Sequence, residues 1–327
     1  MTESAVHGSR RRIRRTGVAA AGFATAALCV VTVAPAVADD GASGAKPTIV
    51  LVHGAFADGS SWNGVIERLE RQGYTVMAPA NPLRGLYSDS TYIASVLKSV
   101  KGPIVLAGHS YGGAVISTAA AGNDQVKSLV YISALMPDVG ESGMSLGARF
   151  PSALGTATRT VPYEAGGGVS GTDLYLKRDK VHPVFAACLP KSQANLLGVT
   201  QRPAATTAFS ETAKVAAWKT IPSWALVGRQ DMTISPDQER FEAKRAHSHT
   251  VEINSCHVSL IAHPADVAAL ILQAATATAT AGGSDRPALA NTGSVQRTAV
   301  VTGLASASLA TGSAVVLLGR RLRRRTY

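Results

Sequence analysis

One serine of the chain lies in a setting in which its hydroxyl could act as a nucleophile. Residues 108–112 read Gly-His-Ser-Tyr-Gly, with Ser110 at the centre. The motif follows the apolar run Pro103–Ala107, which favours a buried strand, and leads into the small-residue stretch Gly112–Ala121, which favours a helix. A Gly-x-Ser-x-Gly turn between a strand and a helix is typical of a nucleophile elbow. The sharp turn strains the serine backbone, and the flanking glycines let the strand and the helix approach each other.

A serine in such a turn needs a base and an acid, because its hydroxyl is a weak nucleophile until a base takes the proton. Asp231 comes four residues after the apolar run that ends at Val227. His257 comes four residues after the run that ends at Ile253. Both side chains are therefore expected in loops that directly follow strands.

The spacing predicts a catalytic triad of these three residues. In this hypothesis His257 deprotonates Ser110 as it attacks an ester carbonyl, Asp231 orients the imidazolium, and water then hydrolyses the acyl-enzyme. Asp237 is a weaker candidate for the acid, because acidic residues are common in the first turn of a helix. His263 is a weaker candidate for the base, because it precedes a proline at a helix start.

Two regions of the chain alternate short apolar runs with helical patterns. Unbroken apolar runs such as Thr48–Val52 are typical of strands buried on both faces of a parallel sheet. The expected strands are Thr48–His53, Thr75–Ala78, Pro103–Ala107, Lys127–Ser133, Ser223–Val227 and Thr250–Ile253. The expected helices are Ser61–Gln72, Ser90–Val100, Gly112–Ala121, Pro236–Ala246 and Pro264–Gln273. This alternation predicts an α/β fold with a mostly parallel sheet and helices on both faces.

The alternation stops between about residues 136 and 207, where glycine and proline are frequent. A structureless loop of this length is uncommon in a compact domain. We therefore expect a cap insertion over about 136–207 that lies over the sheet edge. Two short helices are expected in it, near Phe185–Leu197 and before Gln201.

Two motifs now resemble those of a known family. Residues 53–56 read His-Gly-Ala-Phe after the first expected strand, and residues 108–113 read Gly-His-Ser-Tyr-Gly-Gly. With these motifs, residues 48–273 resemble an α/β-hydrolase-fold enzyme, a fold in which the triad follows the order Ser, Asp, His. The stretch Val52–Trp62 is similar to a bacterial subgroup allied to the small plant esterases and hydroxynitrile lyases.

The resemblance implies an oxyanion hole made by the backbone N–H groups of Ala55 and Tyr111, which would stabilise the developing negative charge. It implies no cofactor. The sequence also lacks a Cys-x-x-Cys pair and a His-Glu-x-x-His helix, so we expect no metal. The aromatic residues Phe56 and Trp62 could line the substrate pocket or serve only in packing.

These features favour a carboxylesterase that acts on small esters. In the plant hydroxynitrile lyases a lysine follows the catalytic histidine, whereas Val258 follows His257 here, so lyase-like chemistry is disfavoured. Perhydrolase chemistry of the haloperoxidase type uses the same triad and stays open as an alternative. A non-catalytic surface binding module on the same fold is a further alternative.

The net charge of +11 does not indicate a nucleic-acid partner. A basic binding face has to lie on the folded body of a protein. The excess of positive charge lies at the two ends of the chain instead, since residues 1–38 and 293–327 hold eleven arginines and one glutamate. The segment between them is nearly neutral.

The N-terminal segment 1–38 reads as a secretory signal peptide. Arginines between Ser9 and Arg15 precede the uncharged stretch Thr16–Val37, and small residues lead to a cleavage site after Ala38. The general secretory route and the twin-arginine route both fit this pattern. Residues 39–273 are then the exported hydrolase domain.

The C-terminal segment reads as a linker followed by an anchor. Residues 274–288 are rich in Ala, Thr and Gly and are expected to be a linker. Residues 289–327 contain Leu-Ala-Asn-Thr-Gly, an uncharged run over 298–319 and an Arg-rich tail. The run is long enough for a transmembrane helix, at roughly 33 Å.

This order resembles the cell-wall sorting signal of Gram-positive surface proteins. Ala290 replaces the proline of the Leu-Pro-x-Thr-Gly pattern, as in the motif attributed to class E sortases. The resemblance implies that a sortase cleaves between Thr292 and Gly293 and joins the chain to a peptidoglycan precursor. It thus implies a secreted protein anchored to the cell wall.

Two cysteines, Cys188 and Cys256, lie in the expected exported domain. In an oxidising compartment they could form one disulfide, which would tie the cap to the loop of His257. Two separate buried thiols are the alternative.

Overall fold

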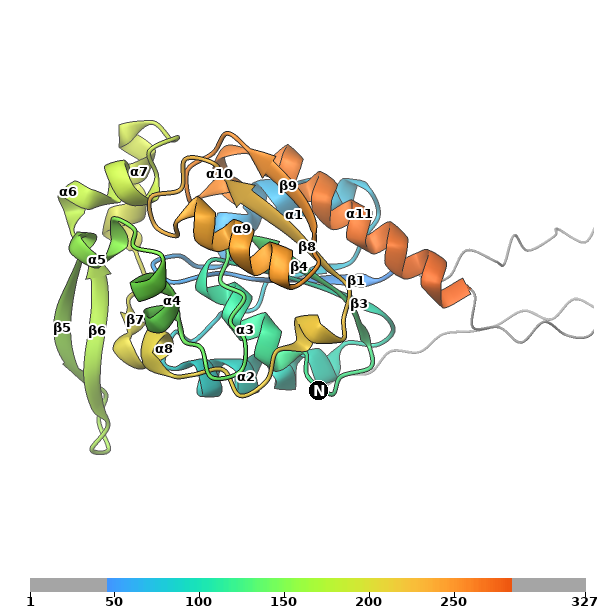
Figure 1. Cartoon of the computed structure of the whole chain (residues 1–327), viewed down its shortest axis with the longest axis horizontal. Coiled ribbons are helices and arrows are strands. Elements are labelled where there is room, and N and C mark those ends of the chain that lie inside the picture. The colour runs from blue at the N-terminus through green and yellow to red at the C-terminus, as the bar shows by residue number, and fades with distance from the viewer. Residues whose placement is uncertain (1–45, 284–327) are drawn as a thin grey trace, which may run out of the picture. The chain divides into compact units, whose positions relative to one another are not determined.

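The central sheet of the computed structural model, which describes residues 46–283, contains six parallel strands (Figure 1). Its spatial order is β2-β1-β3-β4-β8-β9. The strands are β1 (Thr48–Val52), β2 (Val76–Met77), β3 (Ile104–His109), β4 (Val126–Ile132), β8 (Ser223–Gly228) and β9 (His249–Ile253). The expected parallel α/β fold is confirmed.

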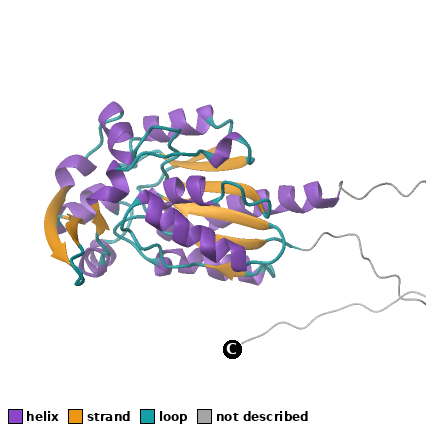
Figure 2. Ribbon diagram, turned by 90° about the horizontal axis from the view of Figure 1, so that it is seen from below, coloured by secondary structure: helices purple, strands orange, loops and turns teal. Residues whose placement is uncertain are grey.

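Helices cover both faces of this sheet (Figure 2). One face carries α1 (Asn63–Arg71) and α11 (Pro264–Gly283), which pack against each other. The other carries α2 (Leu86–Ser99), α3 (Tyr111–Ala119) and α9 (Pro236–Arg245). Residues 49–52 of β1 are fully buried, which explains why this strand is apolar without alternation. Three short helices join these elements: η1 (Gly59–Trp62), η3 (Ala217–Lys219) and α10 (Ser259–Ala262).

The segment between β4 and β8 forms an insertion at the carboxyl ends of the strands. We call residues 136–211 of this segment the cap. Its helices are α4 (Gly143–Arg149), α5 (Leu154–Ala157), α6 (Arg178–Lys180), the π-helix η2 (Val181–Phe185), α7 (Lys191–Thr200) and α8 (Thr206–Ser210). Its strands β5 (Thr158–Glu164), β6 (Ser170–Leu176) and β7 (Ala204–Ala205) form an antiparallel sheet.

The hairpin of β5 and β6 was not expected from the sequence, which predicts only helices in this region. It projects from the body of the protein (Figure 1). Most of its side chains are exposed or only partly buried, and Pro162 lies within β5. Because such a strand carries few apolar residues, its pattern resembles that of a loop.

Helix α11 is longer than expected, and this corrects part of the proposed linker at 274–288. The helix continues from Gln273 to Gly283. Ala274 and Ala275 are fully buried, and Thr278 is hydrogen-bonded to Ser128 of β4 at 2.7 Å. The Ala-rich segment therefore packs on the sheet, and alanine has the highest helix propensity of all residues.

The expected signal peptide, sorting motif and membrane span lie outside the described residues, and they stay predictions. Among the helices of residues 46–283, none is both long and apolar enough to cross a membrane.

Candidate active site

Ser110 lies at the turn between β3 and α3, in the strained conformation that the motif predicts. Its φ is +55°. A Cβ atom on Gly112 would lie 2.5 Å from the carbonyl oxygen of Val52, and one on Gly108 would lie 2.6 Å from the carbonyl oxygen of Gly112. Both flanking glycines are therefore required by close backbone contacts. The strained turn directs the Ser110 hydroxyl away from the strand and toward the loops described next.

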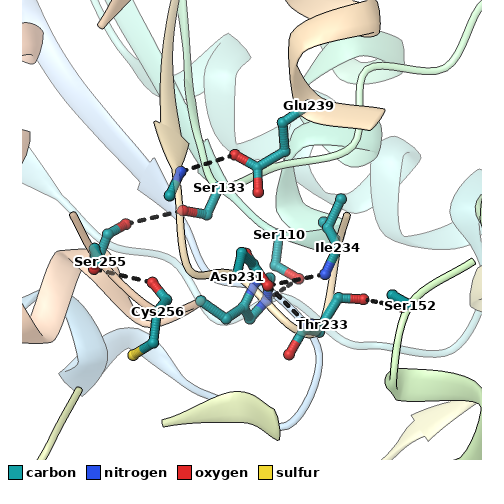
Figure 3. Close-up of polar contacts among 12 residues, drawn as sticks. Ser110, Ser133, Ser152, Asp231, Thr233, Ile234, Glu239, Ser255 and Cys256 are labelled. Atoms are coloured by element: carbon teal, nitrogen blue, oxygen red, sulfur yellow. Dashed lines mark hydrogen bonds and ion pairs between the residues drawn. The ribbon is translucent and has the colours of Figure 1, made fainter. Parts of the chain in front are cut away.

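The structure brings together the three residues of the predicted triad, and Figure 3 labels two of them, Ser110 and Asp231, with their neighbours. The Nε2 atom of His257 lies 2.8 Å from the Oγ atom of Ser110. The Nδ1 atom of the same ring lies 2.5 Å from Oδ2 of Asp231. All three residues are buried, with Ser110 at 7% exposure. They meet because the loops after β8 and β9 leave the same edge of the sheet as the elbow.

The carboxylate of Asp231 is fixed on both of its oxygen atoms. Oδ2 contacts His257, and Oδ1 accepts hydrogen bonds from the backbone amides of Thr233 and Ile234 at 2.7 and 2.9 Å. Partners on both oxygens hold this carboxylate in one orientation.

The weaker candidates for acid and base lie elsewhere. The Asp237 side chain is largely exposed and pairs with Arg240 on the surface of α9. His263 pairs with Asp266 at the start of α11, in a partly exposed position. Neither contacts Ser110.

The two backbone amides of the expected oxyanion hole flank Ser110. A Cβ atom on Gly54 would lie 2.6 Å from Cβ of Ser110, so the loop of Ala55 approaches the elbow closely. Ala55 and Ser110 line the same cavity. Within the described residues, the amides of Ala55 and Tyr111 donate no hydrogen bond. Both are therefore available to a substrate oxygen.

Two buried histidines hold these loops in place. His53 donates from Nδ1 to the carbonyl of Gly54 at 2.9 Å, and its Nε2 accepts from the amide of Asn81 at 2.9 Å. His109 donates from Nε2 to the carbonyl of His257 at 3.1 Å. Burial lowers the pKa of both rings, and that of His109 falls well below its usual value. Both rings are thus neutral supports of the backbone.

The two aromatic residues considered for the pocket have different positions. Phe56 lines the cavity at Ser110, which is one of the two roles that the sequence leaves open for it, and its φ is +63°. Trp62 is fully buried in the hydrophobic core and, in the described part of the chain, is not a cavity residue. The pocket assignment of Trp62 is therefore corrected: its ring packs in the core because η1 turns it inward.

The cavity at Ser110 has a volume of about 450 Å³ and lies between the sheet edge and the cap. None of the described residues that line it carries a charged side chain. Its walls are Ala55, Phe56, Ser110, Leu135, Gly143, Met144, Gly147, Ala148, Pro151, Ser152, Leu154, Gly155, Thr158, Leu174, Phe209, Thr233, Ile234 and Gln238. This apolar lining suits an uncharged ligand.

A disulfide between Cys188 and Cys256 joins the cap to the loop that carries His257. The sequence leaves open whether these two cysteines form a disulfide or remain separate thiols, and the structure shows the disulfide. The cap also contacts this loop through Phe185 of η2, whose ring centroid lies 5.1 Å from that of His257. The position of the imidazole is therefore supported from the cap as well as from the sheet.

Two buried acids on α9 were missed by sequence reasoning. Glu239 and Glu242 are at most 3% exposed, although glutamate is seldom buried. Burial raises the pKa of Glu242 to about 8 and that of Glu239 well above its usual value. The only sequence signal is that both acids share a helix face with Ala243, which is buried too.

No group of three or more His, Cys, Asp or Glu that could hold a metal occurs among residues 46–283.

Comparisons with known proteins found similar sequences and a similar fold. Alpha/beta hydrolase nvfD of Aspergillus novofumigatus is 27% identical over 253 residues, which cover 70% of this chain and 97% of that protein. The carbendazim hydrolyzing esterase of Nocardioides sp. is 33% identical over 110 residues, or 30% of this chain and 46% of the relative.

The solved structure of polyneuridine aldehyde esterase has the same fold, with a TM-score of 0.61 at 18% identity, over 70% of this chain and 98% of that one. A sequence model of the alpha/beta hydrolase family matches residues 49–270, more than half of the chain. This protein therefore belongs to the alpha/beta hydrolase family.

Proposed function

We propose that this protein is a serine carboxylesterase that hydrolyses small, uncharged esters. The observation that carries the proposal is the chain of contacts from Ser110 Oγ through His257 to Asp231, at 2.8 and 2.5 Å, at one end of an apolar cavity. This is the geometry that acyl transfer by a serine nucleophile requires. The named activities of the two esterase relatives support the same reaction class.

In the proposed mechanism, His257 takes the proton of Ser110 as Oγ bonds to the ester carbonyl carbon. The carbonyl oxygen becomes an oxyanion that the amides of Ala55 and Tyr111 stabilise; one such donor contributes about 2.7–4 kcal/mol. The imidazolium then gives its proton to the alcohol oxygen as the carbon–oxygen bond breaks. Water, deprotonated by His257, attacks the acyl-enzyme, and the acid leaves as Ser110 regains its proton.

The substrate class follows from the charges around the cavity. Its described walls hold no cation that could pair with a substrate carboxylate. Transfer of an unpaired charge from water into such a site is costly. The cavity volume of about 450 Å³ lies within the usual range for small-molecule sites.

Kinetics with p-nitrophenyl esters of increasing acyl length test the function. We expect turnover of acetate to hexanoate esters, and kcat/KM at least about 100-fold lower for the charged half-ester of succinate than for the butyrate ester. A fluorophosphonate should label a single peptide, the one that contains Ser110, and mass spectrometry can identify it. Turnover without labelling of Ser110, or labelling at another serine, would refute the assignment. Absence of both would favour a binding module.

We also propose that the protein is exported and attached to the cell wall. The proposal rests on the signal-peptide pattern, on the sorting motif and on the Arg-rich tail. The disulfide supports it, because disulfides persist in oxidising compartments. A sortase and a peptidoglycan precursor would be the partners of the sorting step.

Mass analysis of protein released from the wall tests the attachment. We expect a chain that begins at Asp39 and ends at Thr292 with a peptidoglycan fragment attached. A chain that still carries its Arg-rich tail would contradict sorting, and a chain that still begins at Met1 would contradict export.

A further inference from the structure

A second carboxyl group lies behind the acid of the triad. Glu239 of α9 is 3% exposed, and its Oε2 atom accepts a hydrogen bond from the amide of Gly228 at 3.2 Å. Figure 3 shows this carboxyl directed from its helix toward the end of β8. Asp231 follows the same strand, and its amide donates to the carbonyl of Gly228 at 3.0 Å. The two acids are thus anchored on the same residue, and the negative charge of Asp231 raises the pKa of Glu239.

The two acids differ in the hydrogen bonds that they accept. Asp231 accepts from two amides and contacts His257, so both of its oxygen atoms already have partners. The Oε1 atom of Glu239 is buried and receives no hydrogen bond from any donor within the described residues. A proton on this carboxyl would find its acceptor in the carboxylate of Asp231, whose charge acts on Glu239. Glu239 therefore satisfies its buried oxygen only as a carboxylic acid.

The charges around Glu239 also favour its protonated form. Burial is the main cause that raises its pKa, and the negative charge of Asp231 is the second. Glu242, on the same helix, raises the pKa further. The third titratable group is His257, which faces Glu239 only through Asp231. Two interacting buried carboxyl groups cannot both ionise at low cost, so one proton stays on the pair.

We propose that Glu239 is a positioning residue of the active site, which stays protonated at neutral pH and donates its O–H group to Asp231. This contact holds the carboxylate in the orientation that His257 needs and moderates its negative charge. The inference rests on the proposed function, because Asp231 matters for catalysis only if His257 is the base. Glu239 itself is not among the residues that line the cavity at Ser110.

Two variants separate the effect of the Glu239 proton from the effect of the side-chain volume. Glu239→Gln keeps a neutral donor for Asp231 and an acceptor for Gly228. Glu239→Met keeps a similar volume but removes both. Glu242→Gln is the matched control, because Glu242 is buried on the same helix but accepts its hydrogen bond from Met136 instead.

The experiment follows the titration of the His257 ring by NMR and the acid limb of kcat/KM for p-nitrophenyl butyrate, with the full-length chain. In Glu239→Gln and Glu242→Gln, both midpoints should stay within about 0.3 pH units of the wild type. In Glu239→Met the less stabilised carboxylate holds the imidazolium proton more tightly, so both midpoints should rise. The same variant should lose about tenfold in kcat/KM.

Each outcome bears on the proposal. If Glu239 were ionised, Glu239→Gln would remove a negative charge beside Asp231, and the His257 midpoint would fall, which would overturn the inference. An unchanged midpoint in a folded Glu239→Met variant would overturn it as well. A circular dichroism spectrum checks folding, and the Glu239→Gln result stands even if the methionine variant does not fold. Failure of the esterase assay alone would overturn the proposed function but not the NMR result.

Discussion

Replacing Asp231 with asparagine should lower kcat for ester hydrolysis about ten-thousandfold while the protein stays folded. The reason lies in the contacts of the carboxylate. Its Oδ1 atom accepts from the amides of Thr233 and Ile234, so the single carbonyl oxygen of asparagine has to occupy that position. The asparagine NH₂ group then faces Nδ1 of His257. This donor selects the tautomer with the proton on Nε2, which cannot accept the proton of Ser110.

Steady-state kinetics with p-nitrophenyl butyrate measure the loss, and the denaturation midpoint checks that the variant is folded. Asp237→Asn is the matched control, because this acid is exposed on α9 and should leave kcat unchanged. An Asp231→Asn variant that loses less than tenfold would show that another group orients His257.

Removing the disulfide should cause a large loss of stability. Cys188 and Cys256 are 68 residues apart, and a cross-link over a loop of this size stabilises the folded state by about 4 kcal/mol through the entropy of the unfolded chain. The double variant Cys188→Ala, Cys256→Ala should therefore unfold about 10 °C below the wild type.

Chemical denaturation with and without dithiothreitol measures this contribution. Reductant should lower the unfolding midpoint of the wild type to that of the double variant, because the bond becomes accessible when the chain unfolds. The midpoint of the double variant should not respond to reductant and serves as the control. Equal midpoints for oxidised wild type and double variant would contradict the prediction.

The sequence was most informative where backbone geometry restricts the choice of residue. The elbow at Ser110 needs glycine on both sides, since any Cβ atom there would collide with backbone atoms. This requirement for glycine produces a motif that can be recognised in the sequence. The apolar strands before the elbow and before Asp231 are similarly constrained by burial on both faces. Residue type and position in the sequence were therefore sufficient to predict the triad.

Sequence reasoning failed where tertiary contacts override local preference. Glu239 looks like a surface residue of α9, and only the packing of that helix on β8 places it beside Asp231. The Ala-rich end of α11 looks like a linker because its helix is stabilised by contacts with β4 that no local pattern encodes. Trp62 has the size of a pocket residue, but the direction in which η1 turns it is set by the core.

The cap supplies most of the cavity wall, whereas the triad lies entirely on loops outside it. Substitutions within this one continuous segment alter the space offered to a ligand and leave the reacting atoms in place. Substrate preference and chemistry can therefore diverge separately during evolution. The covalent link from Cys188 to the residue beside His257 sets the limit of that freedom, because every descendant cap that retains the link has to meet the catalytic loop at the same point.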